Sequence, residues 1–130
     1  MTILALACAT ALDACGSQEI QVAKSSPYHR GAEIFLQHCS GCHTLATVGA
    51  EGSATSISNR LKTNGPNFNI RKENVEQVLY AIRNGGFSGA IMPENILVGE
   101  EAQAVAKFLA QYSGLKAEKV PSVSITLSTK

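Results

Sequence analysis

The chain has 130 residues, which is enough for one domain around a single modest core. Its formal net charge is +1, and its basic residues form no run of the kind that binds nucleic acid, so nucleic-acid binding is not expected.

The first segment, residues 2–12, is apolar and is followed by Asp13-Ala14-Cys15. It is too short to span a bilayer as a mature helix, but it suits the hydrophobic region of an export signal. The order Leu, any residue, Ala, Cys resembles a bacterial lipobox, in which the cysteine becomes the lipidated N-terminus. We therefore expect residues 1–15 to be an export signal with a lipid anchor at Cys15. An ordinary cleaved secretory signal without lipid is the alternative.

A short polar stretch, residues 16–26, has the composition of a tether between an anchor and a domain. Ser26-Pro27 then marks the start of a helix, because serine caps free backbone N–H groups and proline fits the first helical position. The sequence predicts this helix over residues 27–38.

The central motif is Cys39-Ser40-Gly41-Cys42-His43, in which two thiols three positions apart are followed directly by a histidine. This pattern is typical of a c-type haem attachment site. Each thiol adds to one porphyrin vinyl group, and the spacing lets one segment reach both. The imidazole of His43 then lies where it can supply the proximal iron ligand.

Two other functions use similar cysteine pairs. A thioredoxin-like redox pair would follow a strand, whereas a helix is predicted before Cys39. A zinc site would need a second cysteine pair further along the chain, and the remaining cysteines, Cys8 and Cys15, lie in the expected signal. A chance occurrence is the third alternative. We expect one covalent haem and no structural disulfide.

Residues 44–64 have no sustained periodicity and are rich in Gly, Ser, Thr and Ala. They are interpreted as a long loop lying over the haem, which would supply the apolar surface that so long a loop needs. Gly65-Pro66-Asn67 is predicted to form a turn.

A second helix is predicted over residues 74–84. Asn74 and Gln77 make a capping box at its start, and Gly85-Gly86 end it. Its core positions follow helical spacing: Val75, Val78, Leu79 and Ile82.

The chain has two methionines, Met1 and Met92, and Met92 is followed by Pro93, which stiffens its loop. After a haem attachment site, Met92 is the candidate sixth iron ligand, because a soft thioether stabilises ferrous iron. Its alternative role is that of a hydrophobic side chain in the core.

The third predicted helix covers residues 99–113, with Glu100 and Glu101 at its positive end. One face carries Ala102, Val105, Leu109 and Tyr112. Residues 115–130 are expected to form a loosely docked or disordered tail. The fold class is therefore all-α, with three main helices.

With these residues in place, the stretch 27–114 resembles a class I c-type cytochrome. It is most similar to small bacterial monohaem cytochromes and to cytochrome-c-like subunits of respiratory oxidases. The resemblance implies three helices and loops wrapped around one covalent haem. It also implies that Gly31 and Phe35 on the first helix meet Leu109 and Tyr112 on the third. By the same resemblance, the carbonyl of Pro66 would hold the proton on the far nitrogen of His43.

The function implied is one-electron transfer by an exported, monomeric carrier that is not an enzyme. Its cofactor-binding residues would be Cys39, Cys42, His43, Pro66 and Met92, with His43 and Met92 on the metal. Its partners would be redox proteins: a membrane-bound oxidase, a quinol-oxidising complex or a soluble carrier. It would lie at the outer face of the cytoplasmic membrane, or in the periplasm or outside the cell. The alternatives are a haem enzyme or gas sensor with a labile Met92 bond, and a fixed subunit of an oxidase complex.

Overall fold

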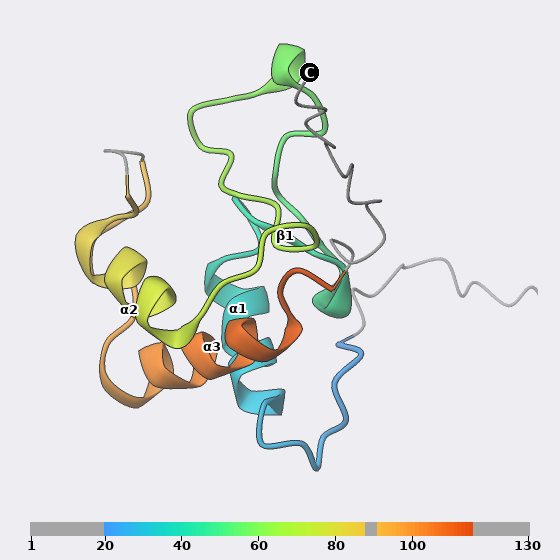
Figure 1. Ribbon diagram of the computed structural model, residues 1–130, viewed down its shortest axis with the longest axis vertical. Coiled ribbons are helices and arrows are strands. Elements are labelled where there is room, and N and C mark those ends of the chain that lie inside the picture. Colours follow the sequence, from blue (N-terminus) through green and yellow to red (C-terminus); the bar gives the residue numbers. More distant parts are fainter. Residues whose placement is uncertain (1–19, 88–90, 116–130) are drawn as a thin grey trace, which may run out of the picture.

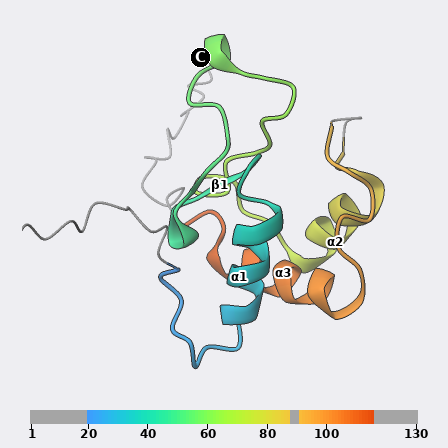
Figure 2. The same cartoon turned by 180° about the vertical axis from the view of Figure 1, so that it is seen from behind.

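The computed structural model describes residues 20–87 and 91–115. The expected signal with Cys15, and the tail from residue 116 onward, lie outside the described residues. Within them the structure is mainly helical, with α1 (His29–His38), α2 (Val75–Asn84) and α3 (Gly99–Tyr112). Figures 1 and 2 show α1 and α3 together at the centre, with α2 at one side and strand β1 toward the other.

Helix α1 begins two residues later than the sequence predicts. Ser26 does act near its start: its hydroxyl accepts a hydrogen bond from the Tyr28 N–H at 3.2 Å, and its carbonyl accepts one from the His29 N–H at 3.1 Å. These bonds form a turn that leads into the helix. The helix ends at His38, as predicted, so the attachment motif directly follows its last turn.

Helix α2 has both of the predicted end structures. The Asn74 side chain accepts from the Gln77 N–H at 2.8 Å, and the Gln77 side chain accepts from the Asn74 N–H at 2.9 Å, which completes the capping box. At the other end Gly85 has a φ of 68°, the left-handed conformation that glycine adopts without a Cβ penalty.

The contact between α1 and α3 is made at Gly31. A Cβ built on Gly31 would lie 2.6 Å from the Phe108 Cβ and would also overlap the Ala104 carbonyl. Only a glycine allows the two helices to approach this closely, so the predicted crossing is present.

The residues opposite Gly31 differ from those expected. They are Ala104 and Phe108, whereas Leu109 and Tyr112 had been expected. Ala104, Phe108 and Tyr112 follow one another at spacings of four and so form one row on α3. Within this row the Tyr112 ring lies 5.8 Å from Tyr28, beyond the crossing point. Leu109 is buried in the core, one position round the helix from this row.

Residues 44–51 are not the irregular loop that the sequence analysis predicts. Strands β1 (Thr44–Leu45) and β2 (Ala50–Glu51) pair antiparallel, joined by the short helix η1 (Ala46–Val48). The hairpin buries Leu45, Val48 and Ala50, a pattern too short for periodicity to reveal. Residues 52–64 are irregular apart from the short helix η2 (Ile57–Asn59), and Figure 1 shows them projecting from the helices in green.

The predicted turn at 65–67 is displaced. Asn67 forms a parallel bridge with Thr44, and the turn follows at residues 68–70. This bridge brings Pro66 and Phe68, on either side of Asn67, to the residues that follow the attachment motif.

Part of the expected tether also packs on the domain. Val22 is buried in the core, and the Gln21 N–H donates to the Thr47 carbonyl at 2.8 Å. The ring of His29 donates through Nδ1 to the Val22 carbonyl at 2.8 Å. Residues 20–26 therefore belong to the folded part of the described structure.

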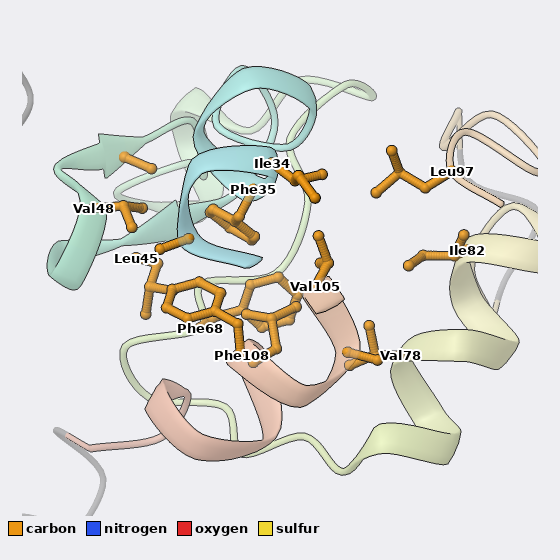
Figure 3. Packing of buried hydrophobic residues seen from close by; sticks show 14 of the residues in the cluster. Ile34, Phe35, Leu45, Val48, Phe68, Val78, Ile82, Leu97, Val105 and Phe108 are labelled. Atoms are coloured by element: carbon orange, nitrogen blue, oxygen red, sulfur yellow. The ribbon is translucent and has the colours of Figure 1, made fainter. Parts of the chain in front are cut away.

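The hydrophobic core lies between α1, α3 and the hairpin, and it extends to α2. Figure 3 shows the rings of Phe35, Phe68 and Phe108 together, with Val78 and Ile82 of α2 further along the same cluster. The Phe35 ring centroid is 6.0 Å from each of the other two rings. Among residues 20–87 and 91–115, no helix has the length and apolar character needed to cross a membrane.

Candidate haem-binding site

The attachment motif begins where α1 ends. The Cys39 N–H still donates to the Phe35 carbonyl at 2.8 Å, and the Cys39 carbonyl accepts from the N–H groups of Cys42 and His43 at 3.1 and 2.9 Å. One hydrogen-bonded turn therefore separates the two cysteines and presents His43 at its end.

The two thiols are free, and they differ in their surroundings. Cys39 is partly buried, and burial, with a smaller contribution from Cys42, raises its pKa to about 12. Cys42 is exposed. Because burial disfavours the thiolate, Cys39 is held as a thiol at neutral pH.

The ring of His43 is held from two sides. Its Nδ1 donates to the Pro66 carbonyl at 3.1 Å, the bond that the family resemblance implies. Its ring stacks on Phe68, with centroids 4.7 Å apart and planes 14° apart. Since a carbonyl only accepts, the proton of the neutral ring must lie on Nδ1. The lone pair of Nε2 is then available to bind a metal.

The electrostatic surroundings keep this ring neutral. Burial lowers the pKa of His43, the hydrogen bond to Pro66 partly opposes that effect, and the nearby Arg71 cation lowers the pKa further. Only the neutral imidazole binds a metal, so the site favours the protonation state that a ligand needs.

Gly65 makes room for His43. A Cβ at this position would lie 2.6 Å from Nδ1 and 2.8 Å from Nε2 of the ring. The Gly65 N–H also donates to the Cys42 carbonyl at 2.6 Å, which ties this backbone to the motif. The imidazole therefore rests directly against backbone, and any larger residue at position 65 would displace it.

Met92 comes from a different segment of the chain. It is partly buried against the hydrophobic core, and its carbonyl lies beside Gly85, just after α2. Figure 1 shows α2 and the chain around it on the side of the molecule away from β1. These contacts join Cys39, Cys42, His43 and Pro66, while Met92 is carried by the segment that follows α2 and packs against the core.

Large apolar side chains are exposed near both regions, as an apolar cofactor would require. Those with more than half of their surface exposed include Leu61 and Ile70 in the loops before and after Pro66, and Phe87 and Ile91 in the chain leading to Met92. Where such side chains form one contiguous patch, they mark a binding surface in a soluble protein. The described residues, by contrast, contain no group of three or more His, Cys, Asp or Glu that could hold a metal ion, as a zinc site would need.

Sequence reasoning missed two residues of this site, Phe68 and Arg71. Phe68 is an isolated apolar residue in a polar stretch, and nothing local indicates that its ring faces His43. Arg71 lies three positions later, in the same segment. Gly65 was expected only as part of a turn, whereas the family resemblance also implied the bond between His43 and the Pro66 carbonyl.

Comparisons with known proteins agree with this geometry. The family model described as cytochrome c oxidase, cbb3-type, subunit III matches residues 26–109. A similar solved structure is that of the c-type cytochrome SorU from Sinorhizobium meliloti. It is 35% identical, covers 68% of this chain and 92% of that chain, and has a TM-score of 0.53. No curated protein is similar enough to count as a match.

The family match extends over most of the chain, and the helices, the motif and the solved structure all agree with the expected cytochrome c fold. The chain belongs to the family of cytochrome c oxidase, cbb3-type, subunit III, and it is a class I c-type cytochrome with covalently bound haem c.

Proposed function

We propose that the chain is a one-electron carrier, with haem attached through Cys39 and Cys42 and with His43 and Met92 as the axial ligands. The observation that carries this proposal is the hydrogen bond from His43 Nδ1 to Pro66, which leaves Nε2 free beside two free thiols. When bound, the haem supplies an iron that alternates between the ferric and ferrous states.

The residues of the chain tune this site rather than transform a substrate. His43 is fixed in one tautomer and one orientation, which makes it a stronger donor. The neutral thioether of Met92 favours the ferrous state and so raises the reduction potential. With His43 and Met92 both holding the iron, a substrate would find no open position on it, so we propose that the protein is not an enzyme.

The sequence and the family support a proposal for where the carrier is located and which partners it has. Covalent haem is attached to exported proteins, in keeping with the apolar segment before Cys15. We propose that Cys15 carries a lipid that anchors the protein at the outer face of the cytoplasmic membrane. Because residues 20–26 pack on the domain, only residues 16–19 would separate that anchor from the folded part. Its partners would be membrane-bound or soluble redox proteins.

A second candidate is a fixed subunit of an oxidase complex, which the description of the matching family favours. The haem chemistry is the same, and only the partner differs. Purification of the native protein from mild detergent extracts distinguishes the two: a fixed subunit co-purifies with other haem proteins in constant ratio, whereas a carrier elutes alone.

The lipid anchor has its own test. The intact gene is expressed in a bacterium that processes lipoproteins, beside the Cys15→Ser variant. The parent is expected in the membrane fraction and the variant in the soluble fraction. A parent that is equally soluble would show that Cys15 carries no lipid.

The haem attachment is tested by intact mass. The parent is expected to exceed the mass of its polypeptide by one haem, and Cys39→Ala combined with Cys42→Ala is expected to lose all covalent haem. Haem that acidified organic solvent extracts from the parent would contradict the proposal.

A further inference from the structure

One buried ionisable group has no part in the site as described so far. Glu73 is only 5% exposed, and Glu73 and Ser113 are the buried polar residues among residues 20–87 and 91–115. A carboxylate that loses its water in this way is strongly unfavourable unless a partner compensates its charge. Its position therefore requires an explanation.

The partner is Arg71. Its Nε lies 2.5 Å from Glu73 Oε1, and its own side chain is 47% exposed. Arginine stays charged at every accessible pH, so the buried carboxylate is compensated permanently. The pair joins a charge held inside the protein to one that reaches solvent.

The end of α3 fixes this pair in place. The hydroxyl of the fully buried Ser113 accepts from the Glu73 N–H at 2.9 Å, and the Gly114 N–H donates to the Phe68 carbonyl at 2.8 Å. The segment from Phe68 to Glu73 is thus held at both ends by residues at the end of α3. Such a segment has little freedom to move its charges.

The same segment lies against His43. Phe68 stacks on the imidazole, and the Arg71 N–H donates to the Asn67 carbonyl at 3.2 Å, which folds Arg71 back beside Phe68. The guanidinium carbon of Arg71 lies 6.0 Å from the centroid of the exposed Phe87 ring. The pair therefore lies close to Phe68, which stacks on His43, and Arg71 also reaches Phe87 just after α2.

We propose that Glu73 is a positioning residue that holds the Arg71 cation beside His43 and compensates its charge, so that the cation does not raise the reduction potential of the haem. The proposal rests on the proposed function, because it requires an iron bound to His43. A negative charge near the iron stabilises the ferric state, and a positive charge stabilises the ferrous state. Within the pair the two effects largely cancel.

Removal of Glu73 alone upsets this balance. Glu73→Gln keeps the shape and an oxygen that accepts from Arg71 Nε, but it leaves the cation uncompensated. The buried position limits screening by salt, so the effect should persist at high ionic strength. At a fixed ambient potential the ratio of ferrous to ferric protein is expected to rise roughly two- to fivefold.

The matched control is Glu76→Gln. Glu76 is exposed in the first turn of α2, three positions from Glu73, and the substitution changes the charge equally. Solvent screens this position, so the ferrous-to-ferric ratio is expected to stay at the parent value. The double variant Glu73→Gln/Arg71→Gln removes both charges of the pair, and its ratio is expected to return close to that of the parent.

The experiment is a spectroelectrochemical titration of the four holoproteins at low and high salt. A second readout, independent of the redox state, is exchange of the Arg71 Nε proton with solvent, which should be faster in Glu73→Gln than in the parent. An unchanged or lower ferrous fraction in Glu73→Gln would overturn the proposal, as would an equal rise in Glu76→Gln. A double variant that stays at the Glu73→Gln value would overturn it too.

Where Glu73→Gln does not fold, Arg71→Gln supplies the test, because Arg71 is half exposed. Its ferrous fraction is expected to fall, because the negative charge of Glu73 is then left without its partner. A ferrous fraction that is unchanged or higher would overturn the proposal. The ferric absorption spectrum of each variant reports axial ligation separately, so failure of the proposed function is visible whatever the potential does.

Discussion

The two regions that carry the proposed axial ligands are built in different ways. Around His43, contacts within the chain fix the ring: a hydrogen bond to Pro66, a stack on Phe68 and backbone contact at Gly65. Around Met92, the chain is tied back to α2 by the Asn95 N–H, which donates to the Ile82 carbonyl at 2.8 Å, while Ile91 beside it is exposed. The first region is organised by the protein. The second packs against α2 and the core and leaves Ile91 exposed, a side chain that a haem would cover.

The largest effect is expected from a substitution at Gly65, whose backbone supports the His43 ring. Gly65→Ala would place a Cβ against the His43 ring and force the imidazole from its position. We expect a loss of about 3 kcal/mol in the free energy of unfolding, from overpacking, together with an altered ferric spectrum. Denaturant unfolding and absorption spectra measure both.

Gly41→Ala is the control for this substitution, since a Cβ at Gly41 would meet nothing within 4 Å. It changes the same type of residue inside the attachment motif. Equal behaviour of the two variants would mean that Gly65 does not support His43.

A somewhat smaller effect is expected at the crossing of α1 and α3. Gly31→Val would push Phe108 and the Ala104 backbone away, at a cost of about 2 kcal/mol. Thermal unfolding is expected at a lower temperature, with the ferric spectrum at low temperature little changed, because neither ligand region is at the crossing. A variant as stable as the parent would show that the helices do not cross at Gly31.

Ser113→Ala tests the His43 region from the end of α3, because Ser113 holds the segment that contains Phe68 and Glu73. It leaves the Glu73 N–H buried without its partner, which is expected to cost about 1 to 2 kcal/mol. The exposed Ser58→Ala serves as the control and is expected to stay within about 0.5 kcal/mol of the parent. If equilibrium unfolding shows equal losses in both, the buried hydrogen bond contributes nothing.

The smallest effect is expected on the Met92 side, at the capping box of α2. Asn74→Ala removes the oxygen that accepts from Gln77, at a cost of about 1 kcal/mol, while methionine ligation is retained. Asn74→Asp keeps an acceptor there and is expected to restore most of this stability. Denaturant titration of the three proteins checks it, and a stable Asn74→Ala variant would contradict it.

Features that depend on residues close together in the sequence could be predicted, and features that depend on distant residues could not. The ends of α2 were predictable because Asn74, Gln77 and Gly85 act within a few residues of one another. The attachment motif was predictable for the same reason. The partners of Gly31 were not, because which row of α3 faces α1 depends on packing between residues more than seventy positions apart. The position of residues 20–26 likewise depends on contacts with Thr47 and His29.

In the site, too, the features set by neighbouring residues could be predicted and those set by distant residues could not. Cys39, Cys42 and His43 could be identified from their spacing, and the family resemblance implied the bond between His43 and Pro66. The turn that stacks Phe68 on His43 and the buried pair of Glu73 with Arg71 could not be predicted. Both depend on the end of α3, about forty residues away along the chain, which holds that segment through Ser113 and Gly114.

We propose that one haem is ligated by His43 from the organised region and by Met92 from the other. The most direct test is the near-infrared spectrum of the ferric holoprotein, with Met92→Ala measured beside the parent. We predict a charge-transfer band of methionine ligation in the parent and its loss in the variant, which should keep its covalent haem, have a lower reduction potential and bind carbon monoxide. A parent without the band, or a variant whose spectrum and potential match the parent, would contradict the claim.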